Sequence, residues 1–290
     1  MEIVKMHALG NNYIYVSLFT ERIEESDLPK LAVAVSDIRK GVGSDGLILI
    51  GPSENPAEAD VQMRIFNADG SEAETCGNGL RCVAKYAYER GYVPNPEFRI
   101  ETKAGIVKAL VHVEAGNHVN RVTIDMGPPA IGASAVGALS SELVGSNVVQ
   151  GKDDAVIEVG NTAVLGTLVS MGNPHFVSFV DDAAAVDVAS IGPVIEKHPL
   201  FPNRINVEFV TPKTRQELDF RVWERGSGIT FACGTGACAS VVAGIHKGVL
   251  DQRVTVHLLG GDLDIEMKDG RVLMTGEAVH VFRGEYAWPR

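Results

Sequence analysis

The stretch Cys76-Gly77-Asn78-Gly79 recurs 157 residues later as Cys233-Gly234-Thr235-Gly236. The same offset relates the segments upstream, because Met63–Asn67 and Phe220–Glu224 both read apolar, arginine, β-branched, aromatic, polar. Single glycine matches often arise by chance, but a cysteine and an arginine-aromatic segment in one register are much rarer. The sequence therefore predicts an internal duplication, with one copy of the unit in each half of the chain.

Both copies show the same pattern of expected secondary structure around the cysteine. Val61–Phe66 and Leu218–Trp223 have the β-branched and aromatic content of strands. Apolar residues at helical spacing follow each cysteine, and a cation followed by glycine, Arg90-Gly91 or Lys247-Gly248, marks the end of each helix. Each cysteine is therefore predicted at the N-terminus of a helix.

Strand signals outnumber helix signals in the rest of the chain. One helix is predicted over Pro29–Lys40, with an apolar face that includes Ile38, and another over Val188–His198. Strands are predicted over Leu47–Ile50, Phe98–Thr102, Ile106–Val113, Val119–Met126, Phe176–Val180, Ile205–Val210, Val254–Leu259 and Val279–Phe282. Many strands around few helices favour an α+β fold.

The length of 290 residues exceeds the ~100–200 residues usual for one domain, so two domains are expected. We place the seam near Gly127-Pro128-Pro129. The N-terminal domain is expected to cover residues 1–127 and the C-terminal domain residues 128–275. The last strand-like segment, residues 276–290, is expected to return to the N-terminal domain and complete it.

Composition and charge exclude several classes of protein. With 45% hydrophobic and 22% charged residues, the chain is unlike disordered, collagen-like or coiled-coil proteins. The net charge of −11 argues against nucleic acid or anionic membrane partners, which require a basic surface. The uncharged stretches Val159–Val180 and Gly226–Ile245 are interrupted by glycines and are not expected to span a membrane. No secretory signal is recognised, so a cytoplasmic location is expected.

The four cysteines, Cys76, Cys82, Cys233 and Cys238, are not expected to form disulfides, because cytosolic thiols are kept reduced. Their Cys-x5-Cys and Cys-x4-Cys spacings differ from the Cys-x2-Cys pattern of structural zinc sites, so no metal is expected. Each cysteine could simply be a small buried apolar residue. The glycine-rich turns after Cys76 and Cys233 favour a chemical role for those two.

A Gly-x-Gly turn at the start of a helix leaves backbone N–H groups unpaired, and together they can bind a carboxylate or phosphate. The same helix terminus is expected to lower the pKa of an adjacent thiol. Two such cysteines, one per domain, are expected to face each other across an interdomain cleft. One thiolate could remove the α-proton of a bound amino acid while the opposite thiol returns one, which inverts the centre. No cofactor is expected, since neither a dinucleotide-binding fingerprint nor a clear pyridoxal-phosphate lysine is found.

At these residues the chain resembles the diaminopimelate epimerase family of pyridoxal-phosphate-independent epimerases. The resembling motifs cover almost the whole chain and are Met6–Asn11, Arg64–Glu72, Cys76–Gly79, Ser170–His175, Glu224–Gly226, Ala232–Ala239 and Thr275–Ala278. The resemblance implies two pseudo-equivalent domains, each a strand-rich, barrel-like sheet around a central helix, with the active site in the interdomain cleft. It also implies a homodimer.

The resemblance further implies interconversion of LL- and meso-2,6-diaminopimelate, for lysine and peptidoglycan precursor synthesis, with Cys76 and Cys233 as the catalytic thiols. His175 and Glu224 would help to set protonation and hold the reacting amino group. The residues implied to bind substrate are Asn11, Asn67, Gly77, Asn78, Asn173, Asn206, Glu224, Arg225, Gly234 and Thr235. Cys82 and Cys238 are interpreted as core thiols.

Each supporting residue also has a simpler interpretation. Isolated asparagines usually satisfy turns, which could apply to Asn67, Asn173 and Asn206. His175 could be a buried core histidine, and Glu224-Arg225 could be a surface ion pair.

Two positions depart from the family, and two rival functions stay open. Asn12 stands where the family usually has aspartate, and Gly46 stands where some members have a glutamine that touches substrate. One rival is a two-cysteine epimerase of proline or hydroxyproline, whose compact substrate has no distal arm. The other is a non-catalytic amino-acid-binding module with the same fold.

Overall fold

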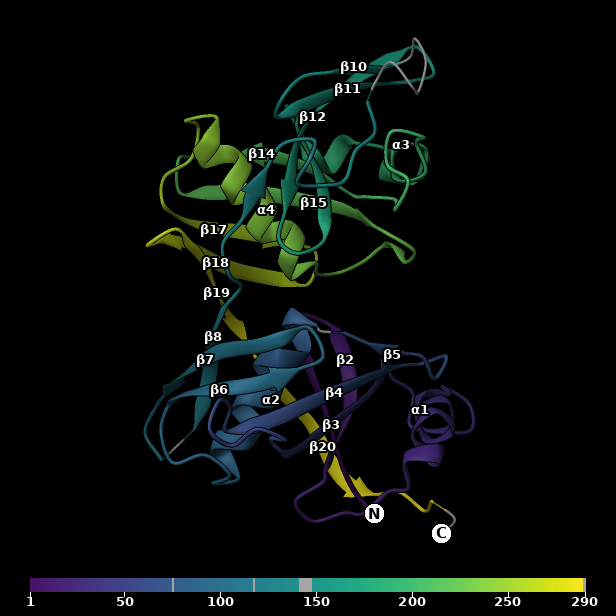
Figure 1. The fold of residues 1–290 in the computed structure, drawn as a ribbon, viewed down its shortest axis with the longest axis vertical. Helices are drawn as coiled ribbons and strands as arrows, with labels where there is room; N and C mark the ends of the chain where they lie inside the picture. Colours follow the sequence, from purple (N-terminus) through teal and green to yellow (C-terminus); the bar gives the residue numbers. More distant parts are fainter. Residues whose placement is uncertain (75, 117, 141–147, 289–290) are drawn as a thin grey trace. The chain divides into compact units, whose positions relative to one another are not determined.

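The computed structural model describes residues 1–74, 76–116, 118–140 and 148–288. The chain divides into two compact units, which we call unit 1 (residues 1–125 and 275–290) and unit 2 (residues 126–274). In the described ranges each unit combines many strands with two α-helices (Figure 1), so the predicted α+β class is confirmed. Among these helices, none is both long and apolar enough to cross a bilayer.

Unit 1 consists of a sheet that packs around one helix and carries a second helix. Its strands are β1 (Glu2–Ala8), β2 (Asn11–Ser17), β3 (Gly46–Pro52), β4 (Val61–Asn67), β5 (Glu72–Ala73), β6 (Glu97–Thr102), β7 (Gly105–Val113), β8 (Val119–Asp125) and β20 (Val279–Glu285). Its helices are the 3-10 turn η1 (Glu25–Asp27), α1 (Leu28–Ser36) and α2 (Gly77–Glu89). β20 returns from the end of the chain and pairs antiparallel with β1.

Unit 2 contains the corresponding elements and an additional hairpin. Its strands are β9 (Ala130–Ile131), β10 (Val148–Gln150), β11 (Asp154–Val159), β12 (Thr162–Ser170), β13 (Pro174–Phe179), β14 (Asn206–Pro212), β15 (Glu217–Glu224), β16 (Gly228–Ile229), β17 (Arg253–Leu258), β18 (Gly261–Lys268) and β19 (Arg271–Glu277), whose end belongs to unit 1. Its helices are η3 (Ala183–Ala185), α3 (Val188–Glu196) and α4 (Gly234–His246).

The strand pairings follow one order in both units. In unit 1, β1 and β2 are antiparallel, β2 and β3 are parallel across α1, β3 and β4 are antiparallel, and β4 and β6 are parallel across α2. In unit 2, the pairs β12–β13, β13–β14, β14–β15 and β15–β17 repeat these directions across α3 and α4. The duplication that the 157-residue offset predicts is therefore present as a shared topology.

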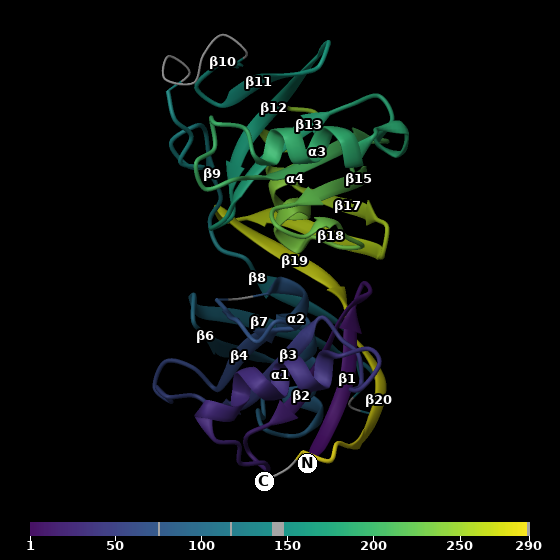
Figure 2. The ribbon, with the colours of Figure 1, turned by 90° about the vertical axis from the view of Figure 1, so that its right-hand side faces the viewer.

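The central strand of unit 1 is buried on both faces because a helix covers each face. Leu47 and Leu49 of β3 belong to an apolar cluster with residues of α1. Ile48, between them, points the other way and packs against Gly79 of α2. Strand alternation thus assigns one face of β3 to each helix, and Figure 2 shows α1 beside β3.

The central strand of unit 2 is arranged in the same way, with one exception in chemistry. Val207 and Phe209 of β14 pack in an apolar cluster that includes residues of α3. Glu208, between them, faces Gly236 of α4. A carboxyl group therefore lies in unit 2 where unit 1 has the aliphatic side chain of Ile48.

Two helices are shorter than predicted. α1 ends at Ser36, because the Asp37 carboxylate accepts hydrogen bonds from the backbone N–H groups of Arg39 and Lys40 at 2.7 and 2.9 Å and stabilises a turn instead. Ile38 lies beyond the helix and is 83% exposed, so its predicted place on the apolar face is wrong. α3 ends at Glu196, two residues before the predicted His198.

Candidate active site

The two repeated cysteines occupy the same structural position. α2 and α4 each have 13 residues, and Cys76 and Cys233 are their N-cap residues in extended conformation. Both helices end before a glycine in the left-handed region, Gly91 with φ 71° and Gly248 with φ 73°. The prediction that each cysteine lies at a helix N-terminus is confirmed.

The Cys76 thiol is bonded to both sides of its turn. Its Sγ accepts a hydrogen bond from the Gly79 N–H at 3.4 Å and donates to Asn11 Oδ1 at 3.6 Å. Asn78, in the first turn of α2, accepts from the buried Arg81 guanidinium, with 2.9 Å between Nη2 and Oδ1. Asn11 therefore contacts the thiol, and Asn78 is held by a charged hydrogen bond.

The two family departures have local explanations. Asp45 Oδ2 accepts from the Asn12 backbone N–H at 2.7 Å, from Asn12 Nδ2 at 3.2 Å and from Asn11 Nδ2 at 2.9 Å. An aspartate at position 12 would place a second carboxylate against this oxygen. A Cβ at Gly46 would lie 2.2 Å from the Phe66 carbonyl oxygen, so this backbone admits no glutamine there.

In unit 2, a chain of hydrogen bonds leads away from Cys233 into the core. Cys233 Sγ lies 3.7 Å from Thr235 Oγ1, which accepts from Asn173 Nδ2 at 3.2 Å. Asn173 Oδ1 lies 3.0 Å from His175 Nε2, and His175 Nδ1 lies 2.7 Å from Glu208 Oε1. The structure thus brings three predicted residues, Asn173, His175 and Thr235, together with Cys233.

Glu208 is the site residue that sequence reasoning missed. It belongs to β14, where the stretch Val207–Val210 is otherwise apolar, and its side chain is 0% exposed. A lone acidic residue inside an apolar strand was the available signal, because an unpaired buried carboxylate is costly. Its partner lies on β13, a parallel neighbour that local sequence patterns do not identify.

The surroundings of Cys233 oppose its ionisation. Burial raises the pKa of Cys233 well above its usual value, and the nearby acidic side chain of Glu224 raises it further. The Gly236 N–H and the Thr235 hydroxyl act in the opposite direction. For Cys233, the expected lowering by the helix terminus is therefore wrong, because burial and negative charge outweigh it.

Glu224 lies close to Cys233 and is largely removed from water. Its Oε1 accepts a hydrogen bond from the Thr230 hydroxyl. Burial raises its pKa, while hydrogen bonds from Thr230 and Cys233 lower it. Glu224 is thus bonded within unit 2 rather than paired with Arg225 at the surface.

Arg225 and two of the asparagines, which lie at strand ends, form hydrogen bonds with neighbouring residues of their own unit. Asn206 is 4% exposed, donates to the Pro174 carbonyl at 2.9 Å and accepts from the Arg225 backbone N–H at 2.9 Å. Arg225 is exposed, and its guanidinium donates to the Asn203 carbonyl at 3.1 Å. Asn67 Nδ2 donates to Ser71 Oγ at 3.0 Å, which suits its simpler interpretation as a turn residue.

The other two cysteines lie in the cores. Cys82 and Cys238 are both 0% exposed. Burial raises the pKa of Cys82 to about 11. Neither thiol is placed to meet a small molecule.

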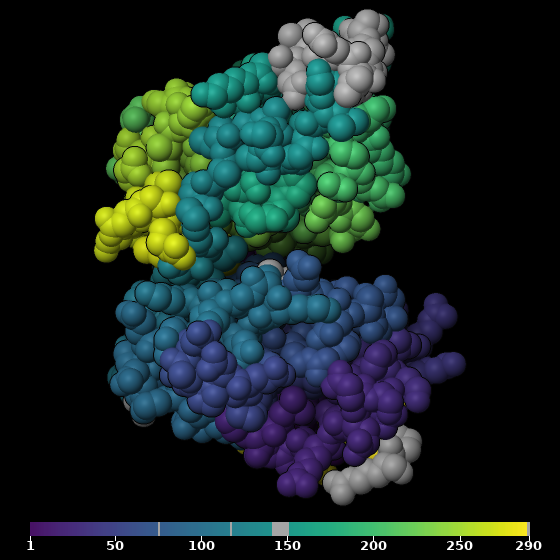
Figure 3. Space-filling model, viewed as in Figure 1, coloured from purple at the N-terminus to yellow at the C-terminus, as the bar shows by residue number. Residues whose placement is uncertain are grey.

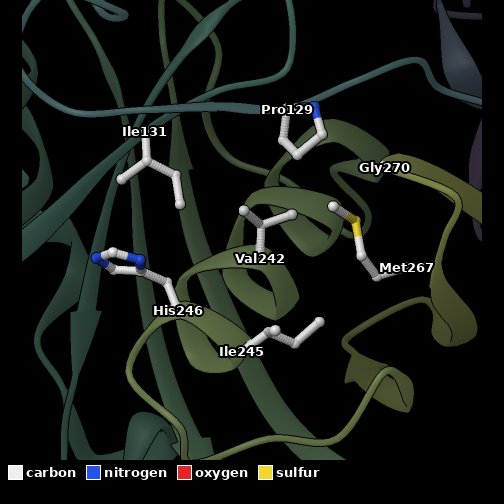
Figure 4. Close-up of a pocket in the computed structure, with 7 residues that line it drawn as sticks. All are labelled: Pro129, Ile131, Val242, Ile245, His246, Met267 and Gly270. Atoms are coloured by element: carbon white, nitrogen blue, oxygen red, sulfur yellow. The ribbon is translucent and has the colours of Figure 1, made fainter.

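A separate apolar pocket of about 440 Å³ lies along the C-terminal half of α4 (Figure 4) and is lined by Pro129, Ile131, Val242, Ile245, His246, Met267 and Gly270. The turn between β18 and β19, which carries Gly270, forms the yellow left edge of unit 2 in Figure 3. This pocket contains none of the predicted site residues. Across the described ranges, no three His, Cys, Asp or Glu side chains gather as a metal site.

Comparisons with known proteins point to one sequence family. The family model "Diaminopimelate epimerase" matches residues 3–131 and 167–281. The diaminopimelate epimerase of Bacillus subtilis (strain 168) is 52% identical and covers 97% of both chains. That of Moorella thermoacetica is 50% identical and covers 99% of both chains.

Solved structures with low sequence identity share the fold. A phenazine biosynthesis protein of the PhzF family from Bacillus anthracis has a TM-score of 0.70 at 18% identity and covers 99% of each chain. A hydroxyproline epimerase from Agrobacterium vitis has a TM-score of 0.68 at 17% identity, covering 98% of this chain and 91% of that one. These similarities establish the two-domain fold alone.

Proposed function

The chain belongs to the diaminopimelate epimerase family, and we propose that it interconverts LL- and meso-2,6-diaminopimelate, in lysine and peptidoglycan precursor synthesis. The family resemblance predicted from the motifs is confirmed. The chain is accordingly an isomerase. The observation that carries the mechanism is that two units of one topology each present a thiol at the N-cap of a 13-residue helix.

In the proposed reaction, the two thiols exchange roles across the substrate α-carbon. One thiolate takes the α-proton, so the C–H bond breaks and its electron pair moves into the carboxylate. The opposite thiol then gives its proton to the other face of the carbon and becomes the thiolate. No net oxidation occurs. Because burial raises the pKa of Cys233, we assign Cys233 as a protonated thiol in the resting enzyme.

The reacting carboxylate is proposed to bind to the first-turn N–H groups of α2 and α4, at Gly77, Asn78, Gly234 and Thr235. Unpaired N–H groups and the helix dipoles stabilise the charge that develops there. This arrangement requires the two helix N-termini to meet across a cleft, which is part of the proposal.

The distal end of the substrate is proposed to bind Arg225, with Asn11, Asn67, Asn173 and Asn206 around it. Among the described residues no acidic side chain pairs with the Arg225 guanidinium, whose only hydrogen bond there goes to a backbone carbonyl. A guanidinium is well suited to a second carboxylate. Asn206 would act chiefly by holding the Arg225 backbone.

Incubation with LL-diaminopimelate in D2O tests the reaction. We expect meso product and deuterium at the α-carbon. L-Proline and trans-4-hydroxy-L-proline serve as rival substrates. Turnover of either, without deuterium in diaminopimelate, would overturn the assignment.

Thiol variants separate an epimerase from a binding module. Cys76→Ser and Cys233→Ser should each lose nearly all inversion, whereas Cys82→Ala, a matched core variant, should keep it. If wild-type protein binds diaminopimelate but exchanges no α-hydrogen, the binding module is the correct function.

A cytoplasmic homodimer is also proposed. All four cysteines carry thiols rather than disulfides, which suits a reducing compartment. Val281 and Phe282 on β20 are 51% and 42% exposed, and apolar side chains on an exposed strand favour association. Light scattering of the purified protein tests the dimer.

A further inference from the structure

His175 and Glu208 form a buried pair in the core of unit 2. His175 Nδ1 and Glu208 Oε1 lie 2.7 Å apart, and both side chains are 0% exposed. A contact this short requires a proton between the two atoms. In the described structure, the other carboxyl oxygen of Glu208, Oε2, has no hydrogen-bond partner.

Burial determines how many protons the pair holds. An ionised Glu208 next to a neutral imidazole would leave one net negative charge in the core, with one oxygen unsolvated. Burial raises the pKa of Glu208, which opposes that state. A neutral pair therefore holds two protons, one between Nδ1 and Oε1 and one on His175 Nε2.

The proton on Nε2 fixes the direction of the remaining hydrogen bonds. His175 Nε2 lies 3.0 Å from Asn173 Oδ1, so a protonated Nε2 donates to this oxygen. The Asn173 Nδ2 group then donates to Thr235 Oγ1 at 3.2 Å. Thr235 Oγ1 is then an acceptor, and its own hydrogen is left for Cys233 Sγ, 3.7 Å away. With a bare Nε2 the amide would turn over, and the hydroxyl would donate to Asn173 instead.

We propose that Glu208 is a positioning residue that sets the direction of this chain, so that Thr235 donates its hydroxyl hydrogen to Cys233 Sγ. Glu208 touches no substrate and acts through His175, Asn173 and Thr235. The inference takes Cys233 as a reacting thiol and to that extent rests on the proposed function.

Comparison with unit 1 supports a specific role for Glu208, because unit 1 has the same strand topology without this hydrogen-bond chain. In the shared topology β3 corresponds to β14, and Ile48 packs against Gly79 as Glu208 packs against Gly236. The parallel pairing that joins Phe176 to Val207 in unit 2 joins Ile14 to Leu47 in unit 1, so Tyr13, one residue before Ile14, lies at the position of His175. The fold alone therefore requires neither the acid nor the histidine.

The direction of the hydrogen-bond chain, set by the proton on His175 Nε2, can be measured in the wild-type protein. Nitrogen-15 NMR of histidine-labelled wild-type protein at pH 7.5 should show a proton on His175 Nε2, with the signal assigned by its absence in His175→Gln. A bare Nε2 would overturn the inference.

Alkylation of Cys233 tests the consequence without requiring turnover. The rate of iodoacetamide modification is followed at pH 8, and tandem mass spectrometry separates Cys233 from Cys238 in the tryptic peptide of residues 226–247. Glu208→Ile, which installs the side chain found at position 48, should slow modification of Cys233 about threefold, because one hydrogen bond to the thiolate is lost. Glu208→Gln should stay within about 1.5-fold of wild type, because its amide N–H can donate to Nδ1.

Faster alkylation of Cys233 in the variants would indicate that Glu208 acts through its negative charge. If Glu208 acted as an uncompensated carboxylate, both variants would remove a negative charge and accelerate alkylation. A faster or an unchanged rate of Cys233 alkylation in Glu208→Ile overturns the inference. If Glu208→Ile does not fold, the NMR measurement on the wild-type protein is the deciding test. Glu196→Gln, which alters another buried acid of unit 2, is the matched control and should change nothing. Because none of these readouts uses diaminopimelate, their failure leaves the proposed function to its own test.

Discussion

Alanine substitutions at Gly79 and Gly236 should have different effects although the two glycines occupy equivalent positions. A Cβ at Gly236 would lie 2.7 Å from Glu208 Oε1 and 3.1 Å from Cys233 Sγ. A Cβ at Gly79 would lie 2.7 Å from Ile48 Cδ1 and 3.0 Å from the Met63 terminal methyl. The geometric conflict is equal, but the displaced groups differ.

The expected losses of stability depend on which side chains must move to make room for the new Cβ. Both alanines gain up to about 1 kcal/mol of helix propensity, and overpacking costs about 1–3 kcal/mol. The ends of Ile48 and Met63 can rotate, so Gly79→Ala should change the free energy of unfolding by less than about 2 kcal/mol. Moving Glu208 also breaks its bond to His175, which adds about 1–3 kcal/mol. Gly236→Ala should therefore lose about 1–5 kcal/mol.

Activity should separate the pair more clearly than stability. Displacement of Cys233 or its hydrogen-bond chain by a fraction of an ångström should lower kcat about 100-fold in Gly236→Ala. Gly79→Ala should lose less than about tenfold. Urea unfolding followed by tryptophan fluorescence and α-hydrogen exchange in D2O measure the two quantities. Equal losses of kcat in both variants, or a greater loss in Gly79→Ala, would refute the reasoning.

Three further predictions concern single side chains. Burial raises the pKa of Glu224, so the Glu224 carboxyl group favours the folded state at low pH, and this contribution to stability is lost as the pH rises. Urea unfolding between pH 4.5 and 7.5 should therefore show Glu224→Gln becoming more stable relative to wild type as the pH rises. A stability difference that does not change with pH contradicts this. Arg225→Met should raise KM about 10- to 100-fold by removing a charged hydrogen bond. Arg253→Met, which breaks only the surface ion pair with Glu266, is the control and should leave steady-state kinetics unchanged. Equal KM values for the two variants argue against a distal carboxylate site at Arg225. Cys82→Ala should lower stability by about 1–2 kcal/mol while kcat stays within about twofold, and a loss as large as that of Cys76→Ser would make Cys82 part of the site.

The two helices that begin at cysteines, α2 and α4, could be predicted because their signals are local and occur twice. The N-cap position of a cysteine and the glycine beyond the last turn depend on neighbours within one helix. The 157-residue offset then linked the two copies and indicated a shared topology. The end of α1 was missed because the Asp37 side chain competes with the helix for backbone N–H groups, a contest that apolar periodicity does not report.

The electrostatic state of the site could not be predicted in the same way. The raised pKa of Cys233 depends on burial and on the Glu224 side chain of β15, which the fold brings to the helix N-terminus. A helix terminus alone favours a thiolate. The sign of the shift is thus a tertiary property, and only the contacts around Cys233 reveal it.

The duplicated units have diverged in buried charge at equivalent positions. α2 carries the buried cations Arg81 and Lys85, whereas the same offset places Cys238 and Val242 in α4. β14 carries the buried acid Glu208 where β3 has an aliphatic residue. Buried cations in one helix and a buried acid beside the other give the two N-caps different surroundings, which an exact repeat would not. The proposed two-base inversion needs one thiolate and one thiol, so two copies that differ in buried charge suit it better than an exact repeat would.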